Sequence, residues 1–62
     1  MTMSGKEFVK LLLQNGWTLD RIASSHHIMI KGEQTLSVPV HAGKDLPTGL
    51  FNKLVKQAGL KL

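Results

Sequence analysis

The residues from Gln34 to His41 alternate between apolar and polar side chains, and this alternation constrains the fold more than any other feature. Leu36, Val38 and Val40 point to one side of an extended strand, and the intervening residues point to the other. A strand with one apolar face is typical of an antiparallel sheet that is covered on that face only. Pro39 has no backbone N–H, so this strand should lie at a sheet edge or end there.

A helix is predicted at the start of the chain. Ser4 and Glu7 have the spacing of a capping box, and Gly16 stands where a left-handed residue ends a helix. The helical stripe between them consists of Phe8, Leu11 and Leu12. Leu13 falls outside that stripe, which suggests that the helix is buried on a broad face.

Further elements are predicted on both sides of the alternating strand. Residues 17–23 and 26–31 favour two strands, with a turn at Ser24 and Ser25, and Gly32-Glu33 favours a two-residue hairpin turn. After a loop, Thr48 is predicted to cap a last helix that Gly59 ends, with an apolar face of Leu50, Phe51, Leu54, Val55 and Ala58. The order predicts a single α+β domain over residues 1–62, with a three-stranded antiparallel sheet and both helices on one of its faces.

The chain is also basic and contains no cysteine. Eight Lys and Arg against four Asp and Glu give a formal net charge of +4, which indicates an anionic partner such as nucleic acid or an acidic protein. The lack of cysteine excludes a disulfide and a thiolate metal site. No segment approaches the roughly 20 apolar residues of a membrane span, and the N-terminal residues do not resemble a signal peptide. We therefore expect a soluble, cytoplasmic protein without a membrane partner.

His26 and His27 open the second predicted strand and are the first candidates for catalysis. If Ile28 and Ile30 face the helices, then His26 lies at the rim of that face, and His27 lies on the open face with Met29. Histidine suits proton transfer near neutral pH, and RNA carries its own nucleophile, the 2′-hydroxyl. One histidine base can therefore cleave RNA without a metal, assisted by cations from Arg21, Lys31, Lys44 and Lys53.

Each of these residues also has a simpler interpretation. A histidine at a strand end is usually only solvated, and this holds still more for His41; Lys53 and Lys56 fit the solvated face of a helix. Trp17 is more typical of a core residue than of a base-stacking platform. Adjacent histidines on a strand point to opposite faces, so we predict neither a metal site nor a cofactor.

Several short motifs, taken with their spacing, resemble the HicA (YcfA-like) mRNA interferase toxins. They are Asn15-Gly16-Trp17, Arg21, Ser25-His26-His27, Val38-Pro39-Val40-His41, residues 44–49 and residues 56–60. The resemblance covers roughly residues 4 to 60.

This resemblance implies a toxin of a type II toxin–antitoxin pair, with an α-β-β-β-α fold like that of double-stranded-RNA-binding domains. Such a toxin cleaves mRNA and is inhibited by its HicB antitoxin. The family's catalytic histidine follows the serine of a Gly-Ser-His motif, which implies that role for His26, after Ser25. Ser24 occupies the position of the family's glycine. His27, Ser25 and the cations named above are then supporting or RNA-binding residues.

Two other functions stay open at the level of the sequence. A non-catalytic double-stranded-RNA-binding module fits the order of the elements and the charge. A protein-interaction domain whose basic surface meets an acidic partner fits the charge alone. Single-stranded mRNA separates these possibilities, because a nuclease cuts the RNA and a binding module only shifts it.

Overall fold

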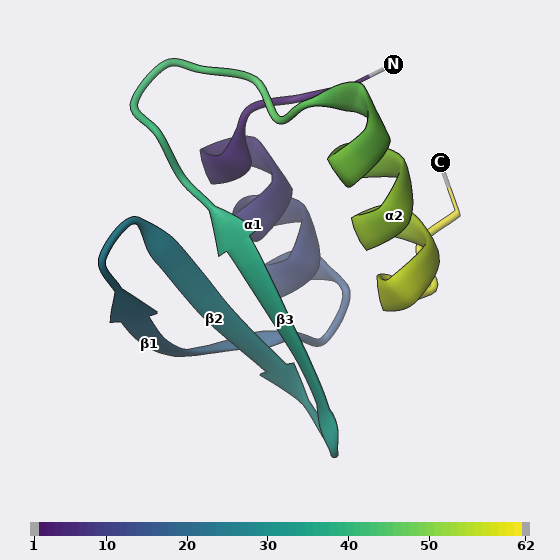
Figure 1. The fold of residues 1–62 in the computed structure, drawn as a ribbon. Coiled ribbons are helices and arrows are strands. Elements are labelled where there is room, and N and C mark those ends of the chain that lie inside the picture. The colour runs from purple at the N-terminus through teal and green to yellow at the C-terminus, as the bar shows by residue number, and fades with distance from the viewer. Residues whose placement is uncertain (1, 62) are drawn as a thin grey trace.

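The computed structural model describes residues 2–61, which form two helices and a three-stranded sheet (Figure 1). In chain order the elements are α1 (Gly5–Gln14), β1 (Thr18–Ala23), β2 (His26–Lys31), β3 (Gln34–Pro39) and α2 (Thr48–Ala58). The strand order is β1-β2-β3, and both pairings are antiparallel. The predicted α+β fold and its α-β-β-β-α order are confirmed. No helix of residues 2–61 has the length and apolar character needed to cross a membrane.

Helix α1 begins and ends at its local signals. The Ser4 hydroxyl oxygen accepts the Glu7 N–H at 3.1 Å, and the Glu7 carboxylate accepts the Ser4 N–H at 3.3 Å, so the predicted capping box is present. Gly16 follows the C-cap residue with φ of 90°. The expected burial on a broad face was wrong, because Leu13 is exposed and only one stripe of the helix is buried.

The hairpin turn at residues 32–33 determines which side of β2 faces the helices. It pairs Lys31 with Gln34, so Met29 lies opposite Leu36. Because directly paired residues share a face, Met29 joins the helix-covered side, where it is fully buried. The predicted faces of β2 were therefore reversed. His27 and Lys31 share the covered side with Met29, and His26, Ile28 and Ile30 lie on the open side.

Strand β1 contains a bulge. The pairing with β2 shifts register between Leu19 and Arg21, so Asp20 is the extra residue. Leu19 pairs with Met29 on the covered side, whereas Arg21 pairs with Ile28 on the open side. A regular strand would have placed residues 19 and 21 on the same face.

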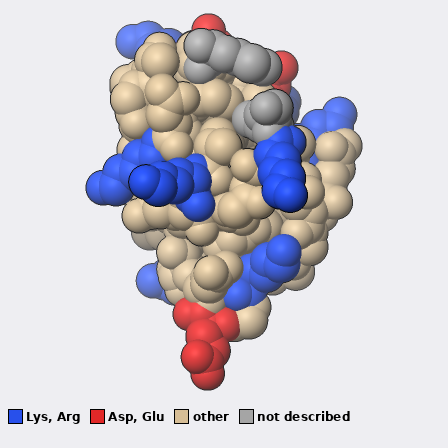
Figure 2. Space-filling model, turned by 90° about the vertical axis from the view of Figure 1, so that its right-hand side faces the viewer, with Lys and Arg blue, Asp and Glu red and all other residues tan. Residues whose placement is uncertain are grey.

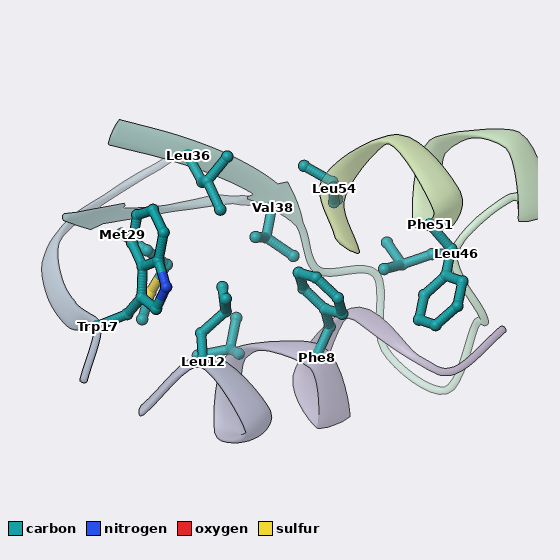
Figure 3. Packing of buried hydrophobic residues seen from close by; sticks show 10 residues of the cluster. Phe8, Leu12, Trp17, Met29, Leu36, Val38, Leu46, Phe51 and Leu54 are labelled. Carbon is teal, nitrogen blue, oxygen red and sulfur yellow. The ribbon is translucent and has the colours of Figure 1, made fainter. Parts of the chain in front are cut away.

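One apolar core joins the sheet to both helices (Figure 3). Phe8 of α1 meets Phe51 of α2 edge to face, with ring centroids 5.8 Å apart. Trp17 is buried beside Met29, as expected for a core residue. The other buried members are Val9, Leu12, Leu36, Val38, Leu46 and Leu54. Because both helices bury their apolar faces against the same side of the sheet, the other side is left open.

The end of β3 and the start of α2 differ slightly from the prediction. β3 ends at Pro39, which fits the missing N–H of proline, and does not continue to His41. Pro47 is the N-cap of α2 and makes no side-chain cap, so the assignment of Thr48 as the cap was wrong. Thr48 is instead the first helical residue, since the fixed φ of proline already sets the entry into the helix. Gly59 ends α2 in the left-handed region, as predicted.

Candidate functional site

His26 is the first residue of β2 and stands exposed on the open face of the sheet. It pairs with Ala23 of β1 and Pro39 of β3. Arg21 pairs with Ile28, so its Cα lies diagonally across from His26 on the same face, about 7–8 Å away. The bulge at Asp20 thus brings a cation beside the candidate base.

The Arg21 guanidinium is not locked in place. It donates to the Asp20 carboxylate at 2.6 Å, and both side chains are exposed. Exposed ion pairs of this kind contribute little to stability, because water screens them. A phosphate can therefore replace the Asp20 carboxylate as the partner of Arg21 at small cost.

The turn before His26 holds a residue in an unusual backbone conformation. Ser24 has φ of 58°, and no other non-glycine among residues 2–61 has a positive φ. The left-handed region suits glycine and strains other residues. The next residue, Ser25, accepts the Val40 N–H at 2.8 Å through its carbonyl oxygen, which fastens the start of β2 to the chain leaving β3. This turn positions His26.

Replacing Ser24 with glycine is expected to raise the free energy of unfolding by about 0.5–1 kcal/mol. Relief of the left-handed strain, about 1–2 kcal/mol, outweighs the extra freedom that glycine has in the unfolded chain. Urea denaturation of the two proteins measures the difference. Ser25→Gly is the matched control. Ser25 does not have a positive φ, so glycine there should lower the free energy of unfolding by about 0.5–1 kcal/mol. A Ser24→Gly protein less stable than wild type would contradict the strain at this position.

His27 lies on the opposite side of the sheet from His26. It pairs with Ile22 and Val38, its side chain is partly buried, and its Nδ1 atom is buried without a hydrogen-bond partner. The prediction that His27 stands on the open face was wrong. The two histidines do lie on opposite faces, as strand alternation requires. However, His26 is on the open face and His27 on the covered face, the reverse of the prediction.

The loop after β3 brings His41 and Lys44 to the end of the sheet where His26 lies. Both side chains are exposed, and the Lys44 N–H donates to the His41 carbonyl oxygen at 3.0 Å. The N-terminal segment anchors this loop, because the Leu46 N–H donates to the Met3 carbonyl oxygen at 2.8 Å. The Thr2 hydroxyl also donates to the Leu46 carbonyl oxygen at 2.6 Å.

Lys31 and Lys53 are not part of this group. Lys31 lies on the covered side, five residues or about 16 Å along β2 from His26. Its ammonium donates to the Asn15 carbonyl oxygen at 3.0 Å, where a cation is favourable beside the C-terminus of α1. Lys53 is exposed on α2, the helix that packs on β3 from the covered side. Figure 2 shows the side carrying α2, where Lys and Arg side chains are spread over the surface rather than gathered in one patch.

The candidate site is therefore an open surface around His26, with Arg21 beside it and the His41–Lys44 loop at its end. Over residues 2–61 no pocket is found. In the same part of the chain, no three His, Asp or Glu side chains form a group able to hold a metal ion.

Comparison with known families identifies one match. Residues 5–60 match the family described as the HicA toxin of bacterial toxin-antitoxin systems. No curated protein sequence matches the chain. The matched range includes all the helices and strands together with the turn before His26.

Proposed function

The chain belongs to the HicA family of toxins of bacterial toxin–antitoxin systems, and from this premise we propose that it arrests growth by cleaving mRNA in the cytoplasm. The family membership confirms the resemblance seen in the sequence and implies an antitoxin partner, for which we propose a HicB protein. The observation that supports cleavage best is the position of His26. It is an exposed histidine on the open sheet face with the Arg21 cation beside it.

In the proposed reaction, His26 is the general base and the RNA supplies the nucleophile. His26 removes the proton of a 2′-hydroxyl, and that oxygen forms a bond to the adjacent phosphorus. The bond from phosphorus to the 5′-oxygen of the next nucleotide breaks. The products are a 2′,3′-cyclic phosphate and a 5′-hydroxyl, and the 5′-oxygen takes its proton from His41, Lys44 or water. No step requires a metal ion.

Arg21 is proposed to stabilise the negative charge that develops on the phosphorane oxygens. A guanidinium presents paired N–H donors that suit a phosphate, and Arg21 already lies on the face of His26. Lys44 is proposed to hold a neighbouring phosphate, and Ser25 to maintain the turn. Lys31 and Lys53 do not lie on the open face with His26, so we assign them at most an outlying contact with the RNA backbone.

Incubation of the purified protein, freed of antitoxin, with single-stranded mRNA tests this proposal. We expect cleavage that persists in EDTA and leaves 2′,3′-cyclic phosphate ends. A single 2′-deoxy nucleotide on the 5′ side of a cleaved bond should abolish cutting there, because it removes the nucleophile. Cleavage of the deoxy substrate, or strong inhibition by EDTA, would contradict the mechanism. RNA that is bound but uncut would favour a non-catalytic double-stranded-RNA-binding module, the alternative that the order of the elements supports.

A further inference from the structure

Three large apolar side chains stay exposed on residues 2–61. Leu13 of α1 is 51% exposed, and Leu19 and Ile22 of β1 are 43% and 57% exposed. Single apolar residues are normal on a protein surface, whereas a contiguous group marks an interaction site. We call these three residues the α1–β1 strip.

The two strand residues of the α1–β1 strip lie on the helix-covered side of the sheet. Leu19 pairs with Met29 and Ile22 pairs with His27, and Met29 is buried in the core on that side. β1 is one edge of the sheet, and α2 packs on β3 at the other edge (Figure 1), so α2 does not cover these two residues.

Leu13 lies on the flank of α1 that faces β1. Phe8 packs against Phe51 of α2, and Leu13 is about 140° further round the helix from Phe8. Val9 is one turn before Leu13 on the same flank and is buried. Because α1 contacts β1 and this flank points away from α2, Leu13 faces toward β1, the strand that carries the other two exposed residues.

Positive charge borders the α1–β1 strip. Lys6 and Lys10 are exposed on α1, and Lys10 is one turn from Leu13. Two copies of the chain meeting through this strip would bring the same lysines together, which is unfavourable. A protein segment with apolar side chains flanked by acidic residues matches both the strip and its border.

We propose that the α1–β1 strip is the surface on which the antitoxin docks, through an apolar segment flanked by acidic residues. The proposal rests on the toxin–antitoxin role described under Proposed function. The outer edge of β1 has no strand partner among residues 2–61, but the bulge at Asp20 interrupts it. Docking therefore relies on side-chain packing rather than on strand addition. Ala23, which follows Ile22 in β1, pairs with His26, so the strip ends close to His26 in the sheet, although on the opposite face.

Leu13→Glu and Ile22→Glu test the proposal, with Thr35→Glu as a matched control on the open face of β3. The probe is the protein encoded by the open reading frame adjacent to this gene, and its affinity is measured by calorimetry. Each strip variant should bind about 30-fold more weakly than wild type, since removing an interface anchor commonly costs about 2 kcal/mol. The control should bind like wild type. In cells, the strip variants should stay toxic when the antitoxin is co-expressed.

The outcomes separate this proposal from the proposed nuclease function. Circular dichroism confirms that each variant is folded, and RNA cleavage by the free variants should match wild type. Unchanged affinity in both strip variants would overturn the docking surface, as would a wild-type chain that does not bind the probe at all. A wild-type dimer that either strip variant dissociates would overturn it in favour of a second copy of this chain. If the wild-type protein does not cleave RNA, the proposed nuclease function is contradicted. The affinities for the probe would still test the docking surface in that case.

Discussion

His26→Ala is expected to lower the rate of mRNA cleavage by about 10²–10⁴-fold, the usual contribution of a general base. His26 is exposed on the open face and makes no side-chain contact that the core requires. The loss should therefore appear in the rate while the free energy of unfolding stays within about 0.5 kcal/mol of wild type. Single-turnover cleavage of a defined mRNA fragment measures the rate, and urea denaturation measures the stability.

His27→Ala is the matched control for this prediction. His27 is partly buried on the other side of the sheet, so its truncation should reduce stability and leave cleavage largely intact. The comparison is sharp because the two residues are adjacent and of the same type. If His27→Ala loses cleavage and His26→Ala retains it, the base is His27 and the reaction takes place on the covered side.

Gly5→Ala is expected to lower the free energy of unfolding by about 2–3 kcal/mol, the upper range for adding one carbon to a tightly packed site. Gly5 is buried at the start of α1, where the helix crosses the end of β3. A Cβ atom there would overlap the carbonyl oxygen of Pro39 and lie 3.0 Å from the Cα of Val40. Both are backbone atoms, so relief requires α1 to move away from the sheet. Since a domain of about 60 residues is only marginally stable, such a loss removes a large fraction of its free energy of unfolding.

Gly49→Ala is expected to raise the free energy of unfolding, in contrast to Gly5→Ala. Gly49 lies in the first turn of α2, and a Cβ there would meet no atom within 4 Å. Alanine is a better helix former than glycine, so this change should stabilise by up to about 1 kcal/mol. Urea denaturation of both variants measures the two effects. A stabilising Gly5→Ala change would show that α1 and β3 do not approach as closely as the structure has them.

Much of the fold was predictable because its signals are local. The capping box at Ser4 and the glycines at 16 and 59 act within one turn of a helix, so they determine helix ends wherever the helix packs. The hairpin at residues 32–33 acts in the same way on two adjacent strands. These local signals therefore predicted the two helices and three strands and their order along the chain.

The faces of β2 were predicted wrongly although the chain contained the signal that decides them. Apolar residues occur on both sides of this strand, so alternation alone did not choose between Ile28 and Met29. Counting back from Leu36 through the two-residue hairpin places Met29 opposite it and settles the choice. The bulge at Asp20 and the positive φ of Ser24 had no comparable signal, because each depends on how β1 and β2 meet.

The amino-acid sequence by itself determined the elements, their order, the positive charge and the motifs that identify the family, since these depend on neighbouring residues or on composition. Only the tertiary structure decided that His26 shares the open face with Arg21, that His27 lies on the covered side, and that Leu13 of α1 stays exposed. The physical reason is that a side chain's face and burial depend on strand register and on how far a helix extends over the sheet. Both are properties of contacts between segments that are distant in the chain.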